Sequence, residues 1–158
     1  MDFKTNCAAV LDSIIKYKIC RRLITRKKRY LSLCSGNKIE TKFILVGDRP
    51  GPSAPTDEDY HHTPFYSLKH CSGWLNYQLE LHTISEENLL WINSANNKGC
   101  ETDPKIIENI GAKIIALGGN ATKWLQRYNF QYYEVNHPQY WKRFKSAYKY
   151  PLLDVLAA

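Results

Sequence analysis

The chain has 158 residues, of which 44% are hydrophobic and 23% are charged, and its net charge is +7 at pH 7. This composition excludes disordered and collagen-like proteins, and the length predicts one domain whose core is large enough to fold without disulfides. No apolar run approaches the roughly 18–20 residues of a membrane span, and the start lacks the pattern of a secretion signal, so we expect an intracellular, cytoplasmic protein.

We expect a single domain over residues 1–158, in which residues 1–36 form a basic, helical N-terminal extension. Apolar residues recur at helical spacing from Val10 to Leu23, which indicates a long amphipathic helix. No acid occurs between Asp12 and Glu40, an interval that holds nine Lys and Arg residues. Such a run is either a solvated helix face or a surface for a polyanion.

Four short apolar runs further along the chain predict buried strands, at residues 43–46, 89–92, 113–117 and 130–135. Helical segments are expected over residues 67–83, after Asp103-Pro104, after Gly118-Gly119-Asn120 and over residues 139–156. Strands that alternate with helices pair in parallel through right-handed crossovers. The fold class is therefore α/β, a three-layer α/β/α sandwich on a four-stranded, mostly parallel sheet.

Polar or small residues follow each predicted strand, namely Asp48, Asn93, Gly118 and His137. Ligands of parallel sheets bind beyond the carboxyl ends of the strands, so these four positions are expected to meet at one edge. The sequence Gly47-Asp48-Arg49-Pro50-Gly51 is typical of a rigid turn with exposed backbone N–H groups.

Three side chains near that edge have the chemistry to hold a flat, polar ring. Phe65 follows a proline and could stack on the ring, and the Asn93 amide offers an acceptor and two donors to a pyrimidine edge. His137, held by Pro138, could donate to developing negative charge. By themselves, Phe65 and Asn93 are more typical of a core Phe and a turn Asn, and His137 fits a satisfied loop His as well as a catalyst.

Aromatic and cationic residues alternate over residues 139–145. Rings that stack or wedge and cations that bind phosphates suit a disrupted nucleic-acid duplex. An amphipathic helix with an aromatic core face would show the same pattern.

The order of these motifs resembles the uracil-DNA glycosylase superfamily. G-x-x-P-G at 47–51, P-F at 64–65, a strand Asn at 93 and H-P at 137–138 are closest to the branch whose first motif reads GEAPG. TPFYSLKHCSGWLNYQL looks like the PFVG…G..L stretch of that family, and IIALGGNATKWL is similar to its strand-LG-x-x-A-x-x-x-L element. The resemblance covers about residues 43–150, most of the chain.

The resemblance implies a monofunctional DNA glycosylase that flips a base out of the stack, because its reacting atoms are otherwise out of reach. His137 would be a catalytic residue that donates to the base O2 as the N-glycosidic bond breaks. Asp48 stands where the branch has Glu and would be the second catalytic residue, positioning water or stabilising the oxocarbenium sugar.

The implied base-binding residues are Gly47, Arg49, Gly51, Phe65 and Asn93. Among them Phe65 would stack on the base, and Asn93 would hydrogen-bond its Watson–Crick edge. The implied DNA-binding residues are Tyr140, Trp141, Lys142, Arg143 and Lys145, of which Tyr140, Trp141 or Arg143 would fill the gap in the duplex.

The chain differs from the GEAPG branch at Arg49 and in its cysteines, and it differs from strict uracil enzymes at Gly51. Arg49 replaces a small residue, or the catalytic Asp of the other main branch, and would favour ionised Asp48 if the two pair. The five cysteines form no CxxC pair, so we expect reduced thiols, no iron–sulfur cluster, no metal and no cofactor. Gly51 stands where strict uracil enzymes carry a bulky group over C5.

A pocket open at C5 favours either uracil or a 5-modified pyrimidine as the base. The polar loop after Gly51 could contact a hydroxymethyl or glucosyl substituent through Asp57, Glu58, Asp59, His61 and His62. Such a protein would serve DNA repair or antiviral defence against phages with modified genomes. We expect a monomer with DNA as its partner and no membrane association.

Other classes of protein remain open at this point. The first alternative is a nucleic-acid or nucleotide-binding module on the same fold that has lost catalysis, which Arg49 and the missing cluster favour. A nucleotide-dependent enzyme is less compatible, because GxGxxG and Walker A sequences are absent. A metal hydrolase using His61, His62 and Asp57 lacks a supporting ligand spacing.

Overall fold

The computed structural model describes residues 3–49 and 63–158, and the side chains from residue 9 onward within these ranges. Its sheet has four strands: β1 (Phe43–Gly47), β2 (Leu89–Asn93), β3 (Lys113–Leu117) and β4 (Tyr133–Val135). The strand order is β2-β1-β3-β4, and all three pairings are parallel. The α/β fold predicted from the sequence is confirmed, with a sheet that is parallel throughout.

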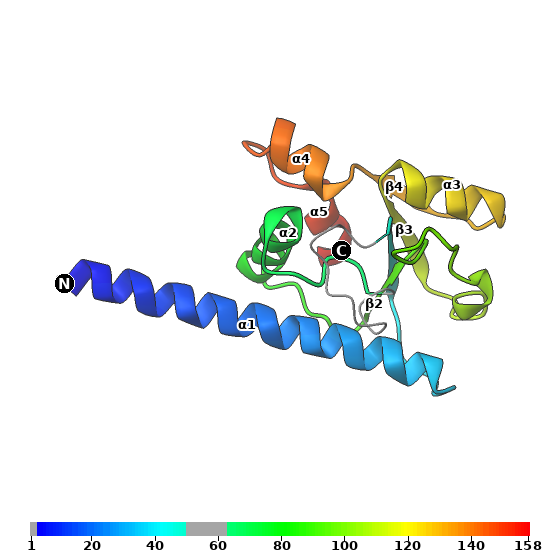
Figure 1. Ribbon diagram of the computed structural model, residues 1–158, viewed down its shortest axis with the longest axis horizontal. Helices are drawn as coiled ribbons and strands as arrows, with labels where there is room; N and C mark the ends of the chain where they lie inside the picture. Colours follow the sequence, from blue (N-terminus) through cyan, green and yellow to red (C-terminus); the bar gives the residue numbers. More distant parts are fainter. Residues whose placement is uncertain (1–2, 50–62) are drawn as a thin grey trace.

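Helices cover both faces of this sheet (Figure 1). They are α1 (Phe3–Cys34), α2 (His70–Leu81), the short 3-10 helix η2 (Pro104–Ile106), α3 (Gly119–Arg127), α4 (Pro138–Phe144) and α5 (Pro151–Ala157). Residues of α2 and α5 share one hydrophobic cluster with the sheet, and residues of α3 share the other. The molecule is therefore a three-layer α/β/α sandwich.

The central strand β1 shows why continuous apolar runs form this sheet. Phe43 and Leu45 pack into the cluster with α2 and α5, whereas Ile44 and Val46 pack into the cluster with α3. Successive side chains of a strand point to opposite faces, so a strand covered on both faces needs apolar residues at every position.

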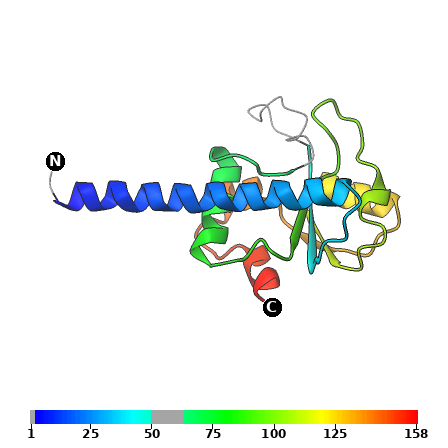
Figure 2. The ribbon, with the colours of Figure 1, turned by 90° about the horizontal axis from the view of Figure 1, so that it is seen from below.

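Helix α1 runs along the β2 edge of the sheet, and its N-terminal part extends beyond the rest of the molecule (Figures 1 and 2). Arg29 Nε donates to the carbonyl of Leu89 in β2 at 2.9 Å. Ile19 and Leu23 are buried, but Val10 and Leu11 are 58% and 60% exposed. The predicted amphipathic packing is therefore confirmed only for the C-terminal part of the helix.

The basic run of α1 does not form one solvated face or one phosphate-binding face. Arg22 and Arg26 are buried and form ion pairs with Glu80 and Glu86. Their spacing of four residues places them on the same side of the helix as Ile19. The remaining exposed cations of α1 include Lys16, Lys18, Arg21 and Lys28.

Three helix predictions need correction. The helix predicted over residues 139–156 is two helices, since α4 ends at Phe144 and α5 begins at Pro151. Proline suits this first helical position, where its missing N–H leaves no hydrogen bond unmade. The helix predicted over residues 67–83 is shorter, because α2 begins at His70 and ends at Leu81. Asp103 does cap a helix start by accepting from Lys105 N, but that helix is a single 3-10 turn.

The fourth strand is shorter than predicted, because β4 begins at Tyr133 rather than at Phe130. The Phe130 ring stacks on Trp124 of α3 instead, with ring centroids 6.1 Å apart.

No helix in the described part of the chain is long and apolar enough to cross a membrane.

Candidate active site

The site begins where β1 and β2 end side by side, with Gly47 paired to Asn93. Asn93 is 2% exposed, and its carbonyl accepts a hydrogen bond from Thr102 Oγ1 at 2.6 Å. A Cβ atom added to Gly47 would lie 2.8 Å from Pro64 Cβ and 3.1 Å from Asn93 Oδ1. Because glycine has no side chain, the segment that leads into Phe65 can pack against β1 at Gly47, beside the Asn93 amide.

Substituting Gly47 by alanine is expected to destabilise the protein by about 1–3 kcal/mol, because the new methyl group overpacks against a rigid proline ring. Urea denaturation measures this change. Gly119→Ala is the control, since nothing lies within 4 Å of a Cβ at that position. Equal stability of the two variants would contradict the close approach at Gly47.

Phe65 and His137 come together from distant parts of the chain. Their ring centroids are 5.5 Å apart with an interplanar angle of 55°, and the Phe65 ring also meets Trp91 edge-on at 6.2 Å. Phe65 has φ 57°, in the left-handed region that costs a non-glycine residue about 1–2 kcal/mol. A strained residue of this kind persists only where its surroundings hold it in place.

His137 connects β4 to α4 and is the N-cap of that helix. Its Nδ1 accepts a hydrogen bond from Gln139 N at 3.1 Å, so the neutral ring carries its proton on Nε2. A Cβ on Gly118 (φ 100°) would lie 3.0 Å from His137 Cβ, which shows how closely the ring packs on the turn after β3. Burial lowers the pKa of His137, and the nearby Asp48 carboxylate opposes that shift.

The lowered pKa of His137 makes stability depend on pH in a defined window. In the unfolded chain the ring titrates near its ordinary value of 6.5, and in the folded protein it titrates below that value. Above about pH 6.5 the residue is neutral in both states, so its contribution to stability is constant. As pH falls below about 6.5 the unfolded chain binds the proton before the folded protein does, and this contribution decreases until the pH reaches the folded pKa.

Urea denaturation at a series of pH values checks this expectation. The free energy of unfolding should fall more steeply with acid in the wild-type protein than in His137→Asn, which keeps a capping side chain but cannot titrate. Equal slopes in the two proteins would contradict a half-buried imidazole that stays neutral in the folded protein.

Asp48 lies within electrostatic range of His137. Its Oδ2 accepts a hydrogen bond from Asn120 Nδ2 at 2.8 Å, and its backbone carbonyl accepts from Ser94 N at 2.9 Å. The sequence allows an ion pair between Asp48 and Arg49. In the structure Arg49 is exposed, and the carboxylate contacts the Asn120 amide instead. Asn120 was missed as a site residue, although its position after the β3 turn places it at the same edge.

Part of the predicted site lies outside the described residues. Gly51, expected beside C5 of the base, belongs to this part, as do the polar loop residues Asp57, Glu58, Asp59, His61 and His62. The predicted contacts of these residues with a base substituent stay predictions. The described portion brings together Gly47, Asp48, Phe65, Asn93 and His137.

Helix α4 divides its aromatic residues between the core and the surface. The Trp141 ring packs against Tyr150 at 5.9 Å, and its Nε1 donates to the carbonyl of Tyr148 at 3.0 Å. Trp141 is thus held in the fold, which argues against its expected use as a wedge in DNA. Tyr140 is 44% exposed, and its ring lies 5.2 Å from that of Phe144.

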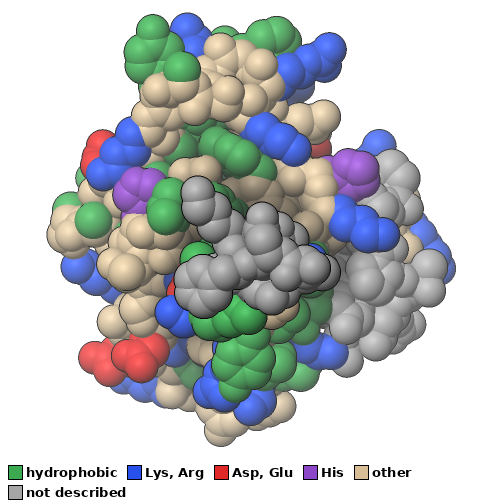
Figure 3. Space-filling view, turned by 90° about the vertical axis from the view of Figure 1, so that its left-hand side faces the viewer, with side chains coloured by type: hydrophobic (Ala, Val, Ile, Leu, Met, Phe, Trp, Pro, Cys, Tyr) green, Lys and Arg blue, Asp and Glu red, His purple; other side chains and the backbone are tan. Residues whose placement is uncertain are grey.

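The cations of the same segment, Lys142, Arg143 and Lys145, are exposed. Arg143 lies over the Phe144 ring, 5.4 Å from its centroid. Figure 3 shows Lys and Arg side chains beside hydrophobic ones at the top of that face, where α4 lies. The surface of α4 thus offers both rings and positive charge.

Within residues 9–49 and 63–158, no group of three or more His, Cys, Asp or Glu side chains is placed to hold a metal ion. Cys20, Cys34, Cys71 and Cys100 are free thiols. The functional groups at the carboxyl ends of the strands are an imidazole, a carboxylate, an amide and an aromatic ring, from His137, Asp48, Asn93 and Phe65.

Comparison with known proteins does not assign this chain to a family: no protein-family model matches it, and no curated protein matches it at a significant level. The fold and the site define a parallel α/β protein with a histidine and a carboxylate near each other at the carboxyl ends of its strands.

Proposed function

We propose that this protein is a monofunctional DNA glycosylase that flips out uracil or a 5-modified pyrimidine, hydrolyses its N-glycosidic bond and leaves an abasic site. The observation that carries the proposal is the Phe65–His137 pair, whose ring centroids lie 5.5 Å apart at the edge where Asp48 and Asn93 also lie. The role in the cell would be DNA repair or defence against phages with modified bases.

The bond that breaks joins N1 of the base to C1′ of the sugar. Its electron pair passes to the base, and negative charge grows on O2, toward which a neutral His137 would present its Nε2–H. The sugar becomes an oxocarbenium ion, which the Asp48 carboxylate would stabilise by its charge. Water adds to C1′ and loses a proton, and the departing base takes one up, so the products are a free pyrimidine and an abasic sugar.

Two further side chains would recognise the base. Phe65 would stack on the pyrimidine ring, and the Asn93 amide would pair with its Watson–Crick edge. Asn93 is 2% exposed, and its amide would discriminate between bases by whether their donors and acceptors match its own. No lysine stands at the four motif positions, so cleavage of the strand through a Schiff base is not part of the proposal.

Duplex DNA is the proposed partner, and the exposed cations of α4 are the proposed phosphate ligands. Substituting Lys142, Arg143 and Lys145 together by serine is expected to reduce the slope of log affinity against log salt by about 0.9 for each phosphate that the variant no longer neutralises. Fluorescence anisotropy with labelled duplex at several salt concentrations measures the slope. Lys113→Ser is the control, since Lys113 is the first residue of β3 and lies at the amino ends of the strands, opposite to the site. An unchanged slope in the triple variant would contradict the assignment of α4 to the DNA backbone.

The direct test of the proposal is release of a base from DNA. Duplexes and single strands that contain uracil, 5-hydroxymethylcytosine, glucosylated 5-hydroxymethylcytosine or only ordinary bases are incubated with the protein, treated with alkali and separated on a denaturing gel. Cleavage at one of the first three bases is expected. Tight binding without cleavage of any substrate would reject the enzyme and support the inactive binding module instead.

A further inference from the structure

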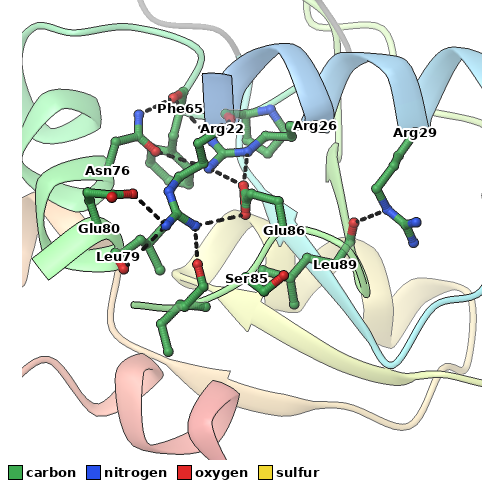
Figure 4. Close-up of polar contacts among 12 residues, drawn as sticks. Arg22, Arg26, Arg29, Phe65, Asn76, Leu79, Glu80, Ser85, Glu86 and Leu89 are labelled. Carbon is green, nitrogen blue, oxygen red and sulfur yellow. Dashed lines mark hydrogen bonds and ion pairs between the residues drawn. The ribbon is translucent and has the colours of Figure 1, made fainter. Parts of the chain in front are cut away.

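The backbone that presents Phe65 is held by a side chain of the N-terminal helix. Arg26 of α1 is completely buried, and its Nη1 lies 3.4 Å from the carbonyl oxygens of both Pro64 and Phe65. Asn76 of α2 donates from Nδ2 to the same Phe65 carbonyl at 2.9 Å and to that of Ser67 at 3.2 Å. Figure 4 shows Arg26 and Asn76 beside Phe65.

The other contacts of Arg26 tighten the same cluster. Its Nε and Nη2 lie 2.8 Å and 2.6 Å from Glu86 Oε1, and Nη2 donates to Asn76 Oδ1 at 3.0 Å. The guanidinium also stacks over Trp91 at 4.0 Å, and Trp91 is the residue that meets the Phe65 ring edge-on. Arg26 therefore supports Phe65 in three ways: it contacts the Phe65 carbonyl directly, it holds the Asn76 amide, and it packs on the Trp91 ring.

The left-handed backbone of Phe65 explains why such support is needed. At φ 57° a phenylalanine is strained and would relax to an ordinary conformation if the surroundings allowed it. Relaxation would move the ring relative to His137, its neighbour across the site.

We propose that Arg26 is a positioning residue for Phe65, so that helix α1 is a working part of the base-binding site and not an appendage. The inference rests on the proposed function of that site. Only a planar guanidinium suits the arrangement, because its several N–H groups point at Pro64, Phe65, Asn76 and Glu86 at once, whereas lysine has a single nitrogen.

Arg26→Lys tests the inference against a control on the same helix. Arg22 has the same charge, an 8% exposed side chain and an ion pair to Glu86. Its other hydrogen bonds go to Ile84, Leu79 and Glu80, so they do not reach the Phe65 segment. Arg22→Lys should thus disturb the helix packing to a similar extent while leaving Phe65 held.

The first measurement is amide hydrogen exchange over residues 63–69, at conditions that give the two variants equal global stability. Exchange in this segment is expected to be about tenfold faster in Arg26→Lys than in Arg22→Lys. Should Arg26→Lys not fold, Asn76→Asp is the second variant, because it keeps the acceptor for Arg26 but loses the donors to Phe65 and Ser67. Equal exchange in the control and the test variant overturns the inference.

The second measurement separates kcat from KM for base release. A displaced Phe65 ring should lower kcat by about 10- to 100-fold in Arg26→Lys, with a much smaller change in Arg22→Lys at matched stability. Equal losses of kcat would mean that Arg26 serves the fold alone and would overturn the inference. If the wild-type protein releases no base from any substrate, the proposed function fails, and hydrogen exchange alone decides the role of Arg26.

Discussion

Substituting His137 by alanine is expected to slow base release by about 10²- to 10³-fold, the loss typical of removing one donor to a developing oxyanion. The ring offers this donor because Nδ1 already accepts from Gln139 N, which leaves the proton on Nε2. Single-turnover formation of abasic sites, at saturating protein, measures the chemical step without product release.

Two further variants separate catalysis from folding. His137→Asn keeps a side chain that can cap α4, but its amide N–H groups lie nearer the backbone than Nε2–H and do not reach the same position. It should therefore be nearly as slow as alanine while recovering the capping contribution of about 1 kcal/mol. His82→Ala is the control for loss of a half-buried imidazole, since His82 contacts Gln78 at the end of α2. Wild-type rates in both His137 variants would remove the imidazole from the mechanism.

Substituting Glu86 by alanine is expected to lower the free energy of unfolding by about 3–5 kcal/mol, a loss typical of breaking a buried ion pair. Glu86 contacts Arg26 at 2.6 Å and Arg22 at 3.5 Å, and the three side chains are at most 8% exposed. Burial lowers the pKa of Arg26, and the Glu86 carboxylate opposes that shift. Removing the carboxylate leaves two buried cations without their shared counterion.

Urea denaturation measures this loss, with Glu87→Ala as the control. Glu87 is the next residue and is exposed, so its substitution should change stability by no more than about 0.5 kcal/mol. A loss below about 1 kcal/mol for Glu86→Ala would mean that the guanidinium groups find other partners, and it would weaken the basis for a fixed Phe65.

The relation between the two experiments is informative in itself. His137 variants test the chemistry at the sheet edge, whereas Glu86 variants test the framework behind Phe65. Loss of activity in Glu86→Ala at a temperature where the protein stays folded would connect the framework to the site. Loss of stability without loss of activity would limit Glu86 to the fold.

Local sequence patterns were sufficient to predict that four strands exist, the bounds of three of them to within one residue, and the ends of the strands at which Asp48, Asn93 and His137 meet, whereas β4 begins three residues later than predicted. The strand β3 has the predicted bounds, and β1 and β2 each extend one residue beyond theirs. A strand covered on both faces leaves a continuous apolar run, which is a strong local signal. Parallel pairing then carries Asp48, Asn93 and His137 to the same edge without any knowledge of side-chain contacts.

Residue type and spacing along the chain were enough to establish the α/β architecture, the succession of motifs and the positive net charge. Packing in three dimensions was needed to show that Arg22 and Arg26 turn inward, that Trp141 packs on Tyr150, and that Asn120 is the partner of Asp48. The reason is physical. A helix pattern shows which residues share a face, but the acceptors and rings that meet that face come from segments far away in the sequence.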